Sequence, residues 1–143
     1  MNIVDAVINN NIQEVKYYIE NGYNIHVEDD LALRWAAEKG YLDIVKYLIG
    51  HGANIHAEND SPLWFAAFYN RFDVVKCLIE HGADFHLLFN GCGNLLKRVA
   101  ENKHFNMVEY LLSLHSVMEL KELFFQIDNL YIKYLILERI IIK

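Results

Sequence analysis

The 143-residue sequence contains one proline, two cysteines and no run of basic residues. Cys77 and Cys92 lack the spacing of a disulfide framework, which favours free thiols in a reducing compartment. The first residues, MNIVDAVINNN, have neither the basic nor the apolar region of a secretory signal. No stretch reaches the roughly 18 uninterrupted apolar residues of a membrane-spanning helix. We therefore expect a soluble intracellular protein with no membrane partner.

Positive charge is also scarce, because the chain has 13 Lys and Arg residues but 19 Asp and Glu residues, for a net charge of −6. Neutralising a phosphate backbone requires clustered Lys and Arg, so we expect no nucleic-acid partner. Hydrophobic residues make up 54% of the chain, which is enough to build a core. Length and composition together predict one globular domain.

One sequence pattern recurs three times at intervals of 30 residues. The copies are VKYYIENGYNIHVEDD at 15–30, VKYLIGHGANIHAEND at 45–60 and VKCLIEHGADFHLLFN at 75–90. The first two copies are identical at ten of sixteen positions. A fixed period of this length is typical of a solenoid, in which each unit covers the hydrophobic face of its neighbour.

Each unit contains the pattern of two short helices. In 31–40, Leu33, Ala36 and Ala37 have helical spacing and Gly40 is a natural end. In 41–52, apolar residues form a second helical stripe that ends near Gly52. In the next copy Ser61 is expected to cap the first helix and Pro62 to occupy its first turn, where a missing N–H costs nothing.

The stretch SPLWFAAFYNRFDVVKCLIEHGADFH, at 61–86, resembles an ankyrin repeat. The matching positions are Ser61, Pro62, Leu63, Ala66, Ala67, Val74, Val75, Leu78, Gly82, Ala83 and Asp84. The resemblance implies an all-α ankyrin-repeat solenoid of antiparallel helix pairs, in a single domain covering 1–143. We expect about five units, at 1–30, 31–60, 61–93, 94–116 and a degenerate C-terminal cap at 117–143.

Short loops, a bias to Asn, Ile, Lys and Tyr, and the segment LRWAAEKGYLDIVKYLI are similar to ankyrin proteins of giant DNA viruses of amoebae. Intracellular bacterial effectors are the second source considered. Under the viral interpretation, the protein acts in the host cytoplasm.

Histidine recurs once per copy, as His26, His56 and His86, and a ladder of metal ligands is one interpretation. Equivalent positions of stacked repeats lie about 10 Å apart, too far for shared coordination, so we expect no metal and no cofactor. A neutral His can instead hold the loop, as Asn does at this position of ankyrin repeats. The resemblance also leaves open hydroxylation of these side chains.

No catalytic arrangement is evident. Cys77 is expected on the outer side of its helix, four residues before His81, but His51 has the same place in a copy without cysteine. Cys92 lies in the segment NGCGN, which matches no phosphate-binding fingerprint. We therefore expect no enzymatic activity.

The ankyrin resemblance implies that partners bind the loop tips and the exposed inner helix face. Aromatic residues and Arg dominate protein-binding hot spots. The candidate partner-binding residues are Trp64, Phe68, Tyr69, Phe89, Arg34, Glu38, Asp30 and Asp60. The alternative is that Trp64 and Phe68 only pack between repeats. Acidic tips beside the aromatics favour a partner with basic residues.

The last 22 residues, ELFFQIDNLYIKYLILERIIIK, are apolar on most sides. One account buries Leu123, Phe124, Ile132, Leu135 and Ile136 against the preceding unit. The other uses surplus apolar residues for contact with a second chain, because exposed apolar patches mark interfaces. The candidate residues for a homodimer contact are Phe125, Leu137, Ile140 and Ile141.

The leading functional hypothesis is a noncatalytic module that binds a host or viral protein through a concave groove and loop tips. A ubiquitin-ligase substrate adaptor is an alternative, although 117–143 is short for an F-box-like segment and has no proline. A self-associating structural or virion component is the third hypothesis, with the apolar C-terminus as its assembly surface. The sequence does not identify the partner.

Overall fold

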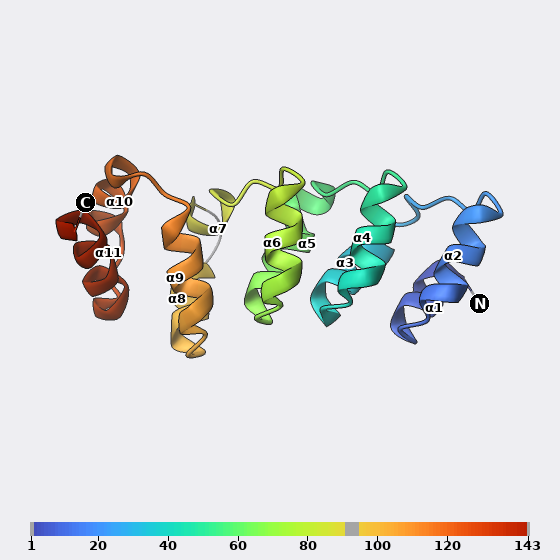
Figure 1. Cartoon of the computed structure of the whole chain (residues 1–143), viewed down its shortest axis with the longest axis horizontal. Coiled ribbons are helices and arrows are strands. Elements are labelled where there is room, and N and C mark those ends of the chain that lie inside the picture. The colour runs from blue at the N-terminus through green and yellow to red at the C-terminus, as the bar shows by residue number, and fades with distance from the viewer. Residues whose placement is uncertain (1, 91–94, 143) are drawn as a thin grey trace. The chain divides into compact units, whose positions relative to one another are not determined.

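The computed structural model describes residues 2–90 and 95–142, which form helices and connecting loops without a β-strand (Figure 1). The chain divides into two compact units, Met1–Leu87 and Leu88–Lys143. The repeating pattern of the sequence lies almost entirely within the first unit. The predicted all-α fold is confirmed, while the predicted bounds of the individual repeats stay predictions.

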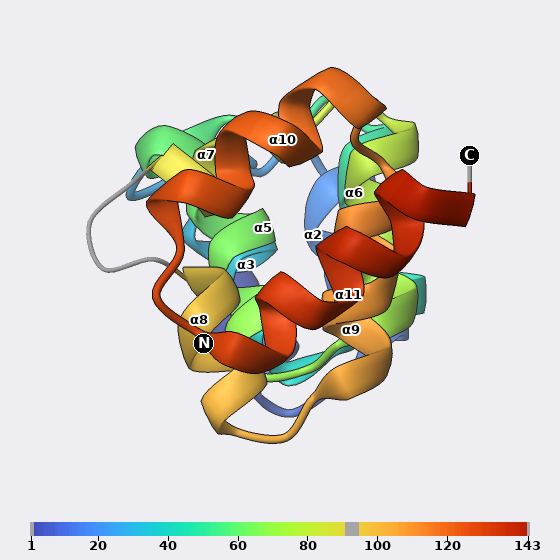
Figure 2. The ribbon, with the colours of Figure 1, turned by 90° about the vertical axis from the view of Figure 1, so that its left-hand side faces the viewer.

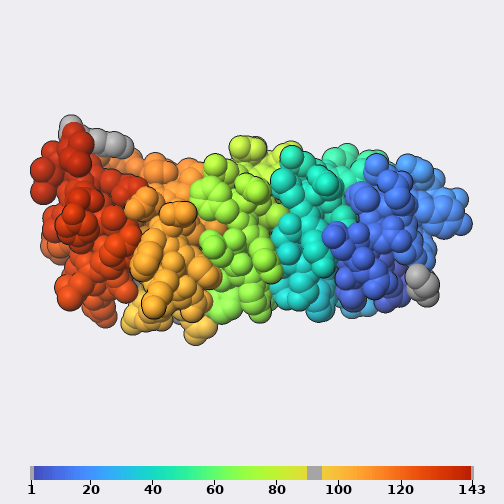
Figure 3. All heavy atoms as spheres, turned by 60° about the horizontal axis from the view of Figure 1, so that its bottom comes forward, coloured from blue at the N-terminus to red at the C-terminus, as the bar shows by residue number. Residues whose placement is uncertain are grey.

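The first unit consists of three helix pairs. They are α1 (Ile3–Ile8) with α2 (Ile12–Glu20), α3 (Leu31–Lys39) with α4 (Leu42–Gly50), and α5 (Ala57–Phe68) with α6 (Phe72–Glu80). The first helices of the pairs contact one another in the order α1, α3, α5, and the second helices in the order α2, α4, α6. Figure 3 shows these pairs as successive blue, cyan and green bands.

The core of the first unit follows the predicted helical stripe. Leu33, Ala36 and Ala37 of α3 are fully buried, as are their counterparts thirty residues later in α5, which are Leu63, Ala66 and Ala67. Small alanine side chains allow adjacent inner helices to approach closely, while leucine fills the space between layers. The repeated sequence therefore builds a repeated core.

The backbone conformation of a few residues determines where the inner helices α3 and α5 begin and end. Gly40 has φ +80° and its N–H donates to the carbonyls of Ala36 and Ala37, as expected of a helix-ending glycine. The predicted cap at Ser61 is wrong. Glu58, Asn59 and Asp60 all have positive φ, so the regular right-handed part of α5 begins only after Asp60. The Ser61 hydroxyl is buried and makes no hydrogen bond among the described residues.

The second unit contains α8 (Leu95–Glu101), α9 (Phe105–Ser113), α10 (Val117–Gln126) and α11 (Leu130–Ile142). The short helix α7 (Leu87–Asn90) lies at the division between the units. A capping box between Ser116 and Glu119 starts α10. The buried core of this unit includes Leu96, Val99, Met107, Val108, Leu111, Leu112, Leu120, Ile132 and Ile136.

Candidate protein-binding surface

The exposed side of the inner helices presents equivalent positions from neighbouring repeats. Arg34 of α3 corresponds to Trp64 of α5, and Glu38 corresponds to Phe68, because the repeat length is 30 residues and α3 packs against α5. All four side chains are partly exposed, and Tyr69 at the end of α5 is exposed. This side of the first unit is thus charged on α3 and aromatic on α5.

Trp64, Phe68 and Tyr69, here called the aromatic surface, form a single cluster. The rings of Trp64 and Phe68, one helical turn apart, are stacked with centroids 5.1 Å apart and an interplanar angle of 9°. Tyr69 meets Phe68 edge to face at 5.0 Å. Phe65 closes the other side against Trp64 at 5.2 Å. Because the rings hold one another in place, they present a preformed surface to solvent.

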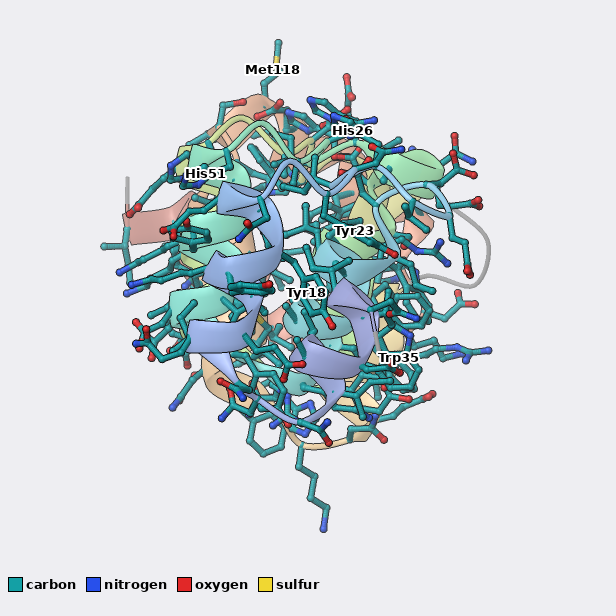
Figure 4. All side chains as sticks on the ribbon, turned by 90° about the vertical axis from the view of Figure 1, so that its right-hand side faces the viewer. Tyr18, Tyr23, His26, Trp35, His51 and Met118 are labelled. Atoms are coloured by element: carbon teal, nitrogen blue, oxygen red, sulfur yellow. The ribbon has the colours of Figure 1, made fainter. Side chains whose placement is uncertain are left out.

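Trp35 extends the aromatic character onto α3, and the sequence reasoning missed it. The Lys39 ammonium lies 4.9 Å from the centroid of the Trp35 ring and 2.9 Å from the Glu38 carboxylate. Trp35 corresponds to Phe65 of the next repeat, so comparison of the two copies was the signal that could have found it. Figure 4 shows the place of Trp35 on the first unit.

The Arg34 side chain contains a buried hydrogen-bond donor that has no acceptor within the described residues. Its guanidinium donates through one terminal nitrogen to the Glu28 carbonyl at 3.4 Å. Its Nε is buried and makes no hydrogen bond within the described part of the chain. An unpaired buried donor carries a desolvation penalty, which is a local cost to the stability of the fold.

The structure removes Asp30 and Asp60 from the candidate surface. Only 3% of Asp30 and 6% of Asp60 is exposed, although both were expected at acidic loop tips. Asp30 accepts a hydrogen bond from the Asn54 N–H at 2.9 Å, and Asp60 accepts one from the Asp84 N–H at 3.2 Å. Each carboxylate therefore connects its loop to the loop of the next repeat.

The recurring histidines complete these loop connections. His26 Nδ1 lies 3.1 Å from Asp30, and His56 Nδ1 lies 2.9 Å from Asp60. This is the loop-holding role expected of His26 and His56, although through a carboxylate. Among residues 2–90 and 95–142, no three His, Cys, Asp or Glu side chains gather in a group suited to a metal ion.

Three consecutive left-handed residues form the tip of each of these two loops. Glu28, Asp29 and Asp30 have φ between 51° and 55°, and Glu58, Asn59 and Asp60 have φ between 49° and 58°. Left-handed backbone costs roughly 1–2 kcal/mol per non-glycine residue, so each tip needs the hydrogen bonds of its aspartate. The exposed acidic side chains that remain at the tips are those of Glu28, Asp29 and Glu58.

Phe89 belongs to the second unit and is considered there. Its ring meets His115 edge to face at a centroid distance of 4.2 Å, and its side chain is half-buried. The His115 ring is itself buried and lies 3.0 Å from the Leu111 carbonyl. Phe89 thus has an internal packing role in its own unit.

Cys77 is buried, contrary to the expected outer position. Burial raises the pKa of its thiol, which opposes formation of a nucleophilic thiolate. His81 Nδ1 lies 3.8 Å from the Cys77 sulfur but only 2.7 Å from the Cys77 carbonyl oxygen. Since Nδ1 must carry its proton to bond that carbonyl, it cannot accept the thiol proton. Cys92 lies outside the described residues.

The structure buries most of the residues of the first account and leaves most of those of the second account exposed, so contact with a second chain stays a prediction. Leu123, Ile132, Leu135 and Ile136 are buried and Phe124 is half-buried. Phe125, Leu137 and Ile141 are exposed, and Ile140 is half-buried. The second unit therefore retains a core while presenting large apolar side chains to solvent.

A family model of ankyrin repeats in three copies matches residues 3–88, more than half of the chain. The chain belongs to the ankyrin repeat family, whose members are in general noncatalytic scaffolds for protein–protein interaction. A search of curated proteins found no match. In the described residues, no helix has the length and apolar character required to cross a membrane.

Proposed function

We propose that this protein is a noncatalytic interaction module that binds a protein partner on the exposed side of α3 and α5. The observation that supports this most is the stacked pair of Trp64 and Phe68, with Tyr69 exposed beside it. Rigid aromatic side chains lose little conformational entropy on binding and are enriched in binding hot spots. Arg34 and Glu38 supply the polar groups next to this cluster.

The partner surface is expected to combine an apolar centre with basic residues. Glu28, Asp29 and Glu58 at the loop tips are exposed, and the chain as a whole has a net charge of −6. Complementary charge raises the association rate more than the final affinity. The partly exposed guanidinium of Arg34, which makes one hydrogen bond of 3.4 Å to the Glu28 carbonyl, additionally favours a carbonyl or carboxylate oxygen in the contact.

We further propose a viral setting for this interaction, on the basis of the amino-acid composition. The Asn, Ile, Lys and Tyr bias resembles that of ankyrin proteins of giant viruses, for which interception of a host protein in the host cytoplasm is the corresponding role. A ubiquitin-ligase adaptor is a narrower form of the same proposal. In that form the captured proteins would include ligase subunits.

An affinity pull-down from host-cell lysate, quantified by mass spectrometry, tests the proposed function. The variant Trp64→Ala/Phe68→Ala/Tyr69→Ala removes the aromatic surface, and circular dichroism checks that it remains folded. Tyr17→Ala is the matched control, because Tyr17 is an exposed aromatic residue on α2. We expect a protein that is retained by the wild type and by the control but lost by the triple variant. Equal recovery by all three would contradict the proposal.

Self-association is a second candidate function, favoured by the apolar surface of the second unit. Phe125, Leu137 and Ile141 are large, apolar and exposed. Exposed apolar patches usually mark interfaces, so this exposure supports a contact with a second copy. In a structural or virion component, this would be the assembly surface.

A further inference from the structure

Four exposed apolar side chains form one stripe along α11. The exposed fractions are 82% for Leu130, 57% for Tyr134, 42% for Leu137 and 78% for Ile141. Their spacings of four, three and four residues are those of the two core positions in a coiled-coil heptad. These four residues are called the α11 seam below.

The α11 seam is on the opposite side from the part of α11 that packs in its own unit. Ile132, Leu135 and Ile136 are buried, and α11 contacts α8, α9 and α10. In heptad terms, these three buried residues take positions remote from the seam. Within the second unit, Figure 2 shows α8 and α9 behind α11. The seam is therefore held on a helix that is already fixed by its own core.

We propose that the α11 seam pairs with the same seam of a second copy of this chain, with the two helices parallel. This inference rests on self-association, the second candidate function, and specifies its contact. The two-fold axis would run along the seam and bring equivalent leucine, tyrosine and isoleucine layers together. A helix fixed in advance loses little entropy when it pairs, which compensates for a seam of only 12 residues, 130–141.

Charges beside the seam favour a parallel pair with a second copy. Lys133 and Glu138 flank the seam on opposite sides and are five residues apart. In a parallel pair, Lys133 of each copy faces Glu138 of the other, so two attractive pairs form by symmetry. In an antiparallel pair, these charges would instead face Ile140 and Tyr131, without a charge partner. The charge pattern thus selects the orientation.

The polar groups of the seam have partners before any association. Tyr134 donates its hydroxyl proton to the Glu138 carboxylate within α11. The Lys133 ammonium lies 5.1 Å from the centroid of the Phe124 ring, at the edge of the seam. Burial of Tyr134 between two copies therefore leaves no unsatisfied hydroxyl, and Glu138 keeps a second carboxylate oxygen for Lys133 of the other copy.

Sedimentation equilibrium across a wide range of concentrations tests this pairing on the full chain. We expect the wild type to form dimers, and Leu137→Ser/Ile141→Ser to raise the dimer dissociation constant at least tenfold while its circular dichroism is unchanged. Met118→Ser is the matched control, because Met118 is also apolar and exposed but lies on α10, outside both the seam and the residues predicted for self-association. It should leave the dissociation constant within twofold.

Charge exchange then tests the orientation. Lys133→Glu alone should weaken the dimer severalfold, and Lys133→Glu/Glu138→Lys should restore it because the cross pairs re-form. A strict monomer at all concentrations would end both the self-association candidate and this inference. A dimer that is unaffected by the seam variant, or that is lost in Met118→Ser, would leave self-association standing and overturn the seam. A dimer that responds to the seam variant without rescue by charge exchange would overturn the parallel arrangement.

Discussion

Asp30 and Asp60 show how single buried side chains determine the loops between repeats. Each carboxylate lies at the end of three left-handed residues and accepts the N–H of a residue 24 positions later, from Asn54 and Asp84 respectively. The energy required by the left-handed backbone is offset locally by charge-assisted hydrogen bonds, which are worth about 1.5–3 kcal/mol each. One residue type at one position thus connects successive repeats.

Substitution of Asp60 tests that connection. Asp60→Ala leaves the Asp84 N–H and the His56 ring without their acceptor, so we expect a loss of about 2–3 kcal/mol in the free energy of unfolding. Urea denaturation measures it. Glu58→Gln removes an exposed charge from the same loop and should change the unfolding free energy by less than about 0.5 kcal/mol. Equal effects of both variants would show that Asp60 is not a connecting residue.

Cys77 should react slowly with alkylating reagents. Burial raises the pKa of its thiol, so little thiolate exists at pH 8 and the rate should rise only as pH is taken above the ordinary thiol pKa of 9.0. Because the folded state holds this proton more tightly, its contribution to stability is present below that pH and is lost as pH rises further. Iodoacetamide labelling of a Cys92→Ser chain measures the rate. Rapid labelling at pH 7 would contradict the buried position.

The residue scale is also where sequence reasoning failed most clearly. Asp30, Asp60 and Cys77 were placed on the surface, yet all three are buried. Acidic residues in a loop are usually solvated, and the sequence does not reveal that three consecutive residues adopt left-handed backbone. The left-handed backbone of the loop tips is what places the Asp30 and Asp60 side chains in the interior. The recurrence of aspartate at one position was the available signal, since a surface position would not require it.

At the scale of the helix, the sequence was a good guide. Leu33, Ala36 and Ala37 were expected on one buried stripe and occupy it, and Gly40 was expected to end the helix and does. Hydrophobic periodicity and a helix-ending glycine are local signals, so they predict a helix and its end without knowledge of the tertiary structure. The Ser61 prediction failed because the three residues before Ser61 have left-handed backbone, which the sequence does not reveal. The Ser61 hydroxyl therefore does not cap the helix.

The close approach of the inner helices depends on the second alanine of each pair. Ala67 is fully buried between helices, so Ala67→Leu should overpack the interface and lower the free energy of unfolding by about 1–3 kcal/mol. Thermal denaturation and urea denaturation both measure this change. Lys46→Leu on the exposed side of α4 is the control and should have little effect. An unchanged stability of the Ala67 variant would mean that the helices can separate at low cost.

The end of α3 makes a second prediction at the same scale. A Cβ added at Gly40 would lie 2.7 Å from Arg71 Cδ, whereas a Cβ at Gly22 would meet no atom within 4 Å. Both glycines have φ near +80°, so each Ala variant should lose about 1 kcal/mol through backbone strain. Gly40→Ala should lose about 1 kcal/mol more, because Arg71 would be displaced from the Glu38 carbonyl that it binds at 2.9 Å. Equal losses by urea denaturation would contradict this account of the contact.

At the scale of the whole molecule, repetition itself was the most informative property of the sequence. Three copies of one pattern predicted the solenoid and indicated where neighbouring repeats would differ, and those differences define the aromatic surface. The C-terminal segment was less predictable, because its apolar residues point both inward and outward. A continuous apolar sequence does not say which residues a core will use, and only the packing of α11 against α8, α9 and α10 separates the two sets.

The two ends of the chain also differ in chemistry. Tyr18 of α2 and Tyr23 of the loop that follows lie close together with ring centroids 5.3 Å apart, as Figure 4 shows. Tyrosine offers an apolar ring with a polar tip, which suits a surface in contact with water. Among the described residues, the second unit exposes leucine, isoleucine and phenylalanine in larger number, together with Tyr134. The four of them that form the α11 seam are those expected to associate.

The most direct test of the central proposal is the affinity of the captured partner for the wild type and for Trp64→Ala/Phe68→Ala/Tyr69→Ala, measured by isothermal titration calorimetry. Loss of a hot spot costs at least about 2 kcal/mol, so the triple variant should raise the dissociation constant by at least roughly 30-fold while Tyr17→Ala leaves it unchanged. A folded triple variant that binds within threefold of the wild type would contradict the proposal that the exposed side of α3 and α5 is the binding site.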